Sequence, residues 1–273
     1  MRNITVNEAE DEVVGYEGES RNGGIGRAVR TMLGRVHTDR PYSFQRMKKA
    51  LSAAWRPRRS VTFNELDSNM FLVHFDHYVD FKRVVEDGPW SFERNLVVLK
   101  STENDELPTE SDMSKVSFWI RLLNVPLSWR NKVSVGRIAA KLGDVMDVDD
   151  AYFENQSKHI RAKVMINILS PLCRFVNVMN LQNEKVRVYI QYEKLPNYCY
   201  WCGLLGHIEK ECLTKPLEID GKTFKDWPFN EHLRASNAWE DGQSWGVQSP
   251  VYVDLSNSKT NTKVQWQNFK GQM

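Results

Sequence analysis

The sequence has no long apolar run, and several features that define common protein classes are missing. No stretch of the 273 residues reaches the length of a transmembrane helix, and residues 2–8 are too polar for a secretory signal. The sequence also lacks the motifs of a phosphate-binding lysine loop, a nucleophile elbow and a metalloprotease helix. These absences predict a soluble intracellular protein of the nucleus or the cytoplasm. They also predict that it is not an enzyme, has no small-molecule substrate and does not bind a membrane.

The sequence also has little net charge, because 37 basic residues are nearly balanced by 35 acidic ones. The distribution says more than the sum: residues 1–20 carry six acids, whereas residues 21–60 carry eleven bases and only Asp39 as an acid. A basic segment of this kind suits phosphate groups. It is equally compatible with a solvated surface whose charge the acidic segment offsets. The charge pattern leaves both interpretations open.

Cysteine is scarce, yet three of the four cysteines lie within fourteen residues. Cys199, Cys202, His207 and Cys212 follow the spacing C-x₂-C-x₄-H-x₄-C. Three thiolates and one imidazole can complete a tetrahedral zinc shell, and four protein ligands leave no open position for catalysis. A chance grouping and a disulfide are the alternatives, but a histidine beside clustered cysteines in an intracellular chain favours metal. The spacing therefore predicts one structural Zn²⁺ in a knuckle over residues 196–214.

The residues between the ligands support this prediction and suggest a binding role. Gly203 lies where the chain must turn tightly around the metal, and Gly206 lies where a side chain would crowd the loop. Tyr200 and Ile208 can form a small apolar face on which an unpaired base stacks. Lys210 is then expected to contact phosphate.

Residues 31–102 alternate in a pattern that predicts a ferredoxin-like βαββαβ sandwich in an α+β fold. On the third strand Phe71, Val73 and Phe75 are expected to face the core. On the second helix Phe81, Val84 and Val85 are expected to point inward. The expected strands are residues 31–36, 61–63, 70–75 and 96–99, and the expected helices are residues 41–56 and 77–86.

RNA recognition motifs share this topology, so their base-stacking residues provide a test. Those modules place aromatic side chains on the exposed face of the third strand. Here that face would hold Met70, Leu72 and His74. The aromatic platform is missing, and the topology alone does not establish base recognition by this half.

Residues 116–195 predict a second β-rich section, with strands near residues 116–122, 144–148, 160–168 and 186–190 and a helix near 133–142. One face of these strands is apolar and the other is basic or aromatic. The second face either binds single strands, with bases on the rings and phosphates on the cations, or simply faces water or a covering helix. The residues on it are Trp119, Arg121, Arg161, Lys163, Arg187 and Tyr189.

The remaining segments have compositions typical of connections and tails. Residues 1–30 lack periodicity and are expected to be a disordered tail. Residues 103–115 form a polar, acidic linker between the two sections. The Ser/Asn/Gln-rich residues 236–273 are expected to be a low-complexity tail.

Several stretches resemble a plant family of LINE-type retrotransposon-related proteins, in which a plant domain of unknown function precedes a CCHC zinc knuckle. The resemblance covers about residues 31–212, and Gly88-Pro89-Trp90 and Glu193-Lys194-Leu195-Pro196 are its most specific marks. It implies nucleic-acid binding with a structural zinc and the coating of element RNA. The family's short Trp-Leu-Arg-Ala motif is altered here to His232-Leu233-Arg234-Ala235. Further matching segments are residues 33–36, 50–57, 69–75, 87–92, 138–143 and 192–199.

Two functions follow as hypotheses. The first is a zinc-dependent module that binds single-stranded RNA or DNA through the knuckle, assisted by basic surfaces. The second is a protein–protein interaction or oligomerisation module without direct nucleic-acid recognition, since knuckles also dock on proteins and the third strand has an apolar outer face. Self-association is compatible with both hypotheses.

Overall fold

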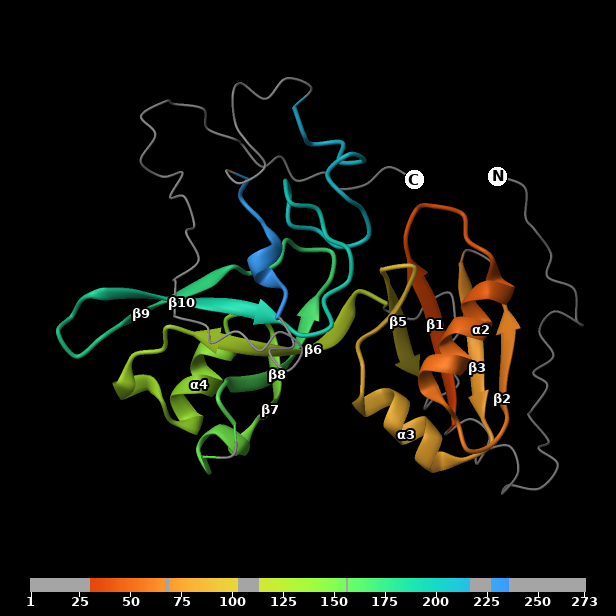
Figure 1. Ribbon diagram of the computed structural model, residues 1–273, viewed down its shortest axis with the longest axis horizontal. Helices are drawn as coiled ribbons and strands as arrows, with labels where there is room; N and C mark the ends of the chain where they lie inside the picture. Colours follow the sequence, from red (N-terminus) through yellow and green to blue (C-terminus); the bar gives the residue numbers. More distant parts are fainter. Residues whose placement is uncertain (1–29, 67–68, 103–112, 156, 217–226, 236–273) are drawn as a thin grey trace, which may run out of the picture.

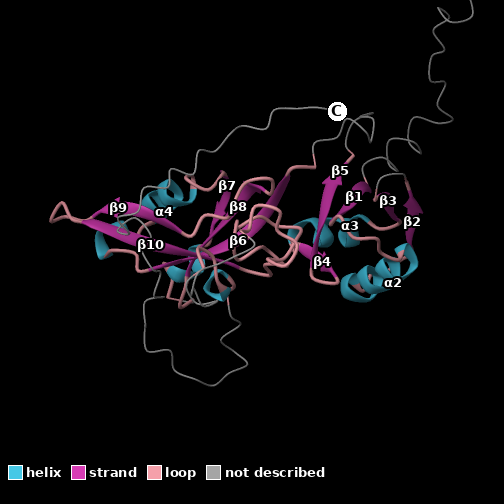
Figure 2. Ribbon diagram, turned by 90° about the horizontal axis from the view of Figure 1, so that it is seen from above, coloured by secondary structure: helices cyan, strands magenta, loops and turns pink. Residues whose placement is uncertain are grey.

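The computed structural model describes residues 30–66, 69–102, 113–155, 157–216 and 227–235. It contains two five-stranded antiparallel sheets side by side (Figure 1), and the view from above shows the same arrangement (Figure 2). The two predicted tails lie outside the described residues, apart from Arg30. So does most of the acidic linker. No helix in the described part of the chain is long and apolar enough to cross a membrane.

The first unit has the predicted ferredoxin-like order, with its sheet arranged β2-β3-β1-β5-β4. The short edge strand β4 is an addition that the sequence pattern missed, because three residues are too few to show alternation. The elements are β1 (Thr31–His37), α2 (Phe44–Trp55), β2 (Val61–Glu65), β3 (Met70–Phe75), α3 (Tyr78–Glu86), β4 (Trp90–Phe92) and β5 (Asn95–Ser101).

Helix α3 is rotated relative to the expectation. Phe81 and Val84 are buried as predicted, but the prediction for Val85 is wrong because this side chain is 48% exposed. The buried position is taken instead by Asp80, whose Oδ2 accepts hydrogen bonds from the backbone N–H groups of Arg58 (2.8 Å) and Arg59 (3.2 Å). A buried carboxylate needs such partners, and satisfying them turns the opposite side of the helix to solvent.

The second unit repeats the strand order of the first. Its sheet runs β7-β8-β6-β10-β9, which matches the first sheet strand for strand. The difference is that the described residues 168–174, between β8 and β9, form no helix in the place where the first unit has α3. Strand β9 was not predicted. The elements are β6 (Lys115–Leu123), α4 (Lys132–Ala139), β7 (Asp144–Val148), β8 (Ile160–Asn167), β9 (Phe175–Met179) and β10 (Lys185–Tyr192).

The outer face of the first sheet, opposite α2 and α3, is buried within the chain. Leu33, Leu96 and Val98 are at most 1% exposed and belong to the same apolar cluster as the core of the second sheet. Met70 and Leu72 of β3 are half-buried and pack against this cluster. This face therefore joins the two units, which explains why it carries aliphatic side chains in place of a base-stacking platform. It is also the face that motivated the protein-interaction hypothesis.

Candidate zinc centre and nucleic-acid interface

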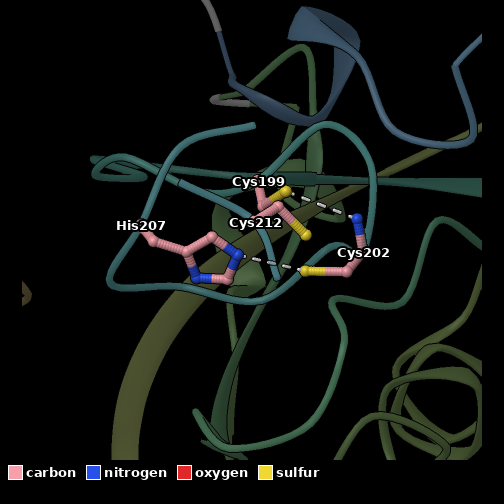
Figure 3. Close-up of side chains that lie close together, drawn as sticks. All are labelled: Cys199, Cys202, His207 and Cys212. Atoms are coloured by element: carbon pink, nitrogen blue, oxygen red, sulfur yellow. Dashed lines mark hydrogen bonds between the residues drawn. The ribbon is translucent and has the colours of Figure 1, made fainter. Parts of the chain in front are cut away.

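Four side chains converge on one point in the segment that follows β10. The ligand atoms of Cys199, Cys202, His207 and Cys212 all lie within 4.8 Å of one another, as Figure 3 shows. The Nε2 atom of His207 lies 3.4 Å from the Sγ atom of Cys202. The backbone N–H of Cys202 points at the Sγ atom of Cys199, 3.5 Å away. These are the four residues predicted from the spacing.

The geometry and the chemistry of this cluster fit one zinc ion. Zn–S and Zn–N bonds of about 2.3 and 2.0 Å at tetrahedral angles place a sulfur and a nitrogen ligand about 3.5 Å apart, close to the observed separation of Cys202 and His207. A hydrogen bond from the side chain of Cys202 lowers the pKa of the Cys199 thiol to about 5. The same contact raises the pKa of Cys202. A divalent cation favours the thiolate form of every cysteine that binds it. The cluster is thus the Cys₃His site of a structural zinc.

Two glycines shape the loop between the ligands, as the sequence predicted. Gly203 has φ +78° and donates a backbone hydrogen bond of 2.8 Å to the carbonyl of Cys199. A Cβ atom on Gly203 would lie 2.2 Å from the ring of Phe229. Gly206 has φ +92°, and a Cβ atom there would lie 2.8 Å from the ring of His37. His37 is the last residue of β1, so the knuckle loop also packs against the first unit.

The knuckle is built into the second unit. Tyr198, Leu205 and Phe229 are at most 9% exposed and belong to the apolar cluster of the second sheet. Leu233, in the 3-10 helix η5 (Glu231–Leu233), is fully buried in the same cluster, whereas His232 beside it is exposed. The altered motif therefore keeps its leucine in the core and turns the substituted position to solvent. Folding of the zinc loop and packing of the second sheet are consequently linked.

The predicted base-stacking pair is divided between two environments. Tyr200 packs against the core, with its ring centroid 5.0 Å from that of Tyr198, and its carbonyl accepts a hydrogen bond from Phe229. Ile208 instead lines a cavity shared with the first unit, and Tyr200 is not part of that lining. Lys210 is exposed on the knuckle. The structure thus brings Ile208 into one cavity with Tyr42 and Asn95 of the first unit, which the sequence did not predict.

The basic face of the second sheet contains an internal ion network. The guanidinium of Arg161 lies 4.5 Å from the ring centroid of Trp119 and donates hydrogen bonds of 2.8 Å to Glu193 and to Asp149. Arg121 donates a hydrogen bond of 2.6 Å to Glu193. Burial acts to raise the pKa of Glu193, but the hydrogen bonds from the two arginines outweigh it and lower that pKa. Two cations and two anions balance here, so this part of the face has no surplus charge for phosphates.

The other predicted contacts on this face are less enclosed. The ammonium of Lys163 donates a hydrogen bond of 3.0 Å to the carbonyl of Glu86, at the end of α3. The guanidinium of Arg187 lies 4.8 Å from the ring centroid of Phe175. The partners Glu193 and Asp149 were not predicted from the sequence. Glu193 directly follows β10, and a carboxylate at a strand end beside an alternating arginine row was the available signal.

Comparisons with known proteins agree with this organisation. Residues 25–110 match the family model "Domain of unknown function (DUF4283)", and residues 166–214 match the family model "Zinc knuckle". The chain therefore carries a DUF4283 domain followed by a CCHC zinc knuckle. The match to the zinc-knuckle family begins inside β8, so that family model also includes β9 and β10, which precede the knuckle. A search of curated proteins gave no match.

Among solved structures, one match is the RNA binding domain of Hrp1 in complex with RNA. The identity is 8% and the TM-score 0.25, over 60% of this chain and 96% of that one. The assignment of an α+β fold with two antiparallel sheets rests on the strand order of the chain itself.

Proposed function

We propose that this chain binds single-stranded RNA or DNA through its zinc knuckle, as a binding protein and not as an enzyme, in the nucleus or the cytoplasm. The observation that carries the proposal is the convergence of three thiols and one imidazole in a segment that matches a zinc-knuckle family. Zinc knuckles are among the modules that recognise unpaired nucleotides.

Surface charge supports the same proposal. Lys49, Arg56, Arg58 and Arg59 are exposed at and beyond α2, and in the described residues no ion pair occupies their side chains. Together with Lys210 they offer cations to a phosphate backbone. Contacts of this kind are sequence-independent and weaken as salt rises.

A retrotransposon origin is part of the proposal. It is supported by the order of a DUF4283 domain and a zinc knuckle, and by the residues that resemble plant LINE-type proteins. In such an element the chain would coat RNA, which calls for affinity without strict sequence preference.

Binding to single strands is expected to exceed binding to duplexes of equal length and to fall steeply with salt. Fluorescence anisotropy with labelled 20-nucleotide strands, titrated from low to high salt, measures both properties. Each phosphate contact to a single strand contributes about 0.7 to the slope of log affinity against log salt. Equal affinity for duplex and single strand, or an affinity independent of salt, would contradict the proposal.

Charge reversal at Lys163 or Arg187 tests the sheet face separately. If these cations hold phosphates, Lys163→Glu and Arg187→Glu should each reduce the salt slope by about 0.7 or more. Arg161→Glu would also place a third acid beside Glu193 and Asp149, so its effect on binding must be compared with its melting temperature. Glu193→Gln is the control that disturbs the ion network without adding a negative charge. Unchanged slopes in the Lys163 and Arg187 variants would remove this face from the account.

A further inference from the structure

A cavity of about 280 Å³ lies between the first unit and the zinc knuckle. Its wall is formed by the loop between β1 and α2, the start of β5, Asn197 two residues before the first zinc ligand, and the loop that carries His207. Its volume is close to the lower bound of about 300 Å³ for small-molecule sites, which suits one flat ring system. The lining residues used below are Arg40, Tyr42, Asn95, Asn197, Ile208 and Glu211.

The lining offers apolar surface beside amide groups. Tyr42 is half-buried, is held by an edge contact with Phe92 at 6.0 Å between ring centroids, and donates its hydroxyl to the carbonyl of Asn69. Ile208 brings an aliphatic side chain from the knuckle. An aromatic ring and an aliphatic side chain in one cavity suit a planar base, because bases stack on such surfaces.

The amides can read the edge of that base. The backbone N–H of Asn197 donates a hydrogen bond of 2.7 Å to the carbonyl of Arg94, which fixes the position of this residue. The carboxamide of Asn197 has no hydrogen-bond partner among the residues that the structure describes. Within the described part of the chain, the carboxamide of Asn95 makes one long contact, of 3.5 Å, from its Nδ2 atom to the carbonyl of Glu93. A carboxamide supplies both donors and an acceptor, the pairing that base edges require.

Two ion pairs flank the cavity. Arg40 of the first unit pairs with Glu211 of the knuckle, and Arg46 pairs with Glu93. The two arginine side chains are 64% and 72% exposed. Exposed pairs contribute little to stability, so a phosphate can compete with either carboxylate for the guanidinium.

We propose that this cavity is a nucleobase-binding subsite formed jointly by the DUF4283 domain and the zinc knuckle. This inference rests on the proposed single-strand binding, and it places one base of the bound strand in this cavity. Tyr42 and Ile208 hold the base, Asn197 and Asn95 contact its edge, and Arg40 contacts the adjoining phosphate. The first unit therefore supplies part of the base-binding surface in addition to packing against the knuckle.

The test uses the full chain with single-stranded hexamers of RNA and of DNA, one set for each base, measured by fluorescence anisotropy. Tyr42→Leu is expected to weaken binding about tenfold, as the loss of one stacked base does. Asn197→Leu is also expected to weaken binding about tenfold, because the edge of the base loses its hydrogen-bonding partner. Tyr42→Phe keeps the ring and should bind normally. Tyr78→Leu is the matched control, because it removes a 52% exposed aromatic ring on α3 outside the cavity and should bind normally. Asn197→Leu should also reduce the difference in affinity between the four bases.

Zinc content and melting temperature are measured on each variant. If Tyr42→Leu lowers the melting temperature, the affinity of the Asn197→Leu variant decides whether the cavity binds a base. If both variants bind like the unaltered chain while Cys202→Ser loses binding, the subsite is wrong and the knuckle still binds single strands. If the unaltered chain binds no hexamer of either nucleic acid, the proposed function itself fails.

Discussion

Replacing Cys202 by serine is expected to remove the zinc, unfold the knuckle and abolish binding to single strands. A serine hydroxyl is not among the usual zinc ligands, and structural zinc contributes on the order of 10 kcal/mol in isolated zinc-finger peptides. Because Tyr198, Leu205 and Phe229 share one apolar cluster with the second sheet, the loss extends beyond the loop. We expect the free energy of unfolding to fall by about 5 kcal/mol or more.

Cys173 provides a matched control for this substitution. It is half-buried, donates its thiol to the carbonyl of Phe175 at 3.3 Å, and lies outside the zinc cluster. Cys173→Ser keeps a donor at that position and should retain zinc and binding. Metal content, urea denaturation and anisotropy are compared for the two variants. A Cys202→Ser protein that binds single strands as tightly as the Cys173→Ser protein would exclude the knuckle as the binding site.

Replacing Leu33 by alanine is expected to destabilise the chain strongly and to leave the intrinsic affinity for single strands unchanged. Leu33 is fully buried where the first sheet meets the core of the second unit. Removing a buried leucine side chain costs about 2–5 kcal/mol, depending on how far the cavity collapses. Urea denaturation measures this loss, and binding is measured at a temperature at which the variant is folded.

The control for Leu33 is Leu127, whose side chain is 82% exposed, so that Leu127→Ala should change stability by less than about 0.5 kcal/mol. The comparison decides between two roles of the outer face of the first sheet. An internal interface loses stability, whereas a nucleic-acid platform of the kind found in RNA recognition motifs loses affinity. Weaker binding with unchanged stability in Leu33→Ala would contradict the buried interface.

The sequence predicted the features that depend on local spacing. The zinc ligands lie within fourteen residues, so the four positions and both glycines could be read directly. Alternation along the strand predicted β3, β6, β8 and β10, and short apolar segments predicted β1, β2, β5 and β7. The three-residue β4 is too short to show alternation, and β9 (Phe-Val-Asn-Val-Met) has apolar residues on both faces, so neither gave such a signal. Val85 was misassigned because the buried Asp80 sets the rotation of α3 through partners more than twenty residues away.

The features that the sequence could not predict depend on contacts between distant segments. Arg161 was correctly placed on the polar face of its strand, but its partner Glu193 lies 32 positions away. The cavity at Ile208 needs Tyr42 and Asn95 of the first unit. The repeat of strand order in the second unit was hidden because the segment between β8 and β9 contains no helix. Alternation identifies the faces of a strand but not what covers each face.

The most direct test of the account is the amount of zinc per chain, determined by elemental analysis of protein purified under reducing conditions. The account predicts one zinc ion for each chain, lost when a strong chelator is added and regained when zinc is restored. Protein that contains no zinc and takes up none would contradict the assignment of Cys199, Cys202, His207 and Cys212 as ligands, and with it the proposed function.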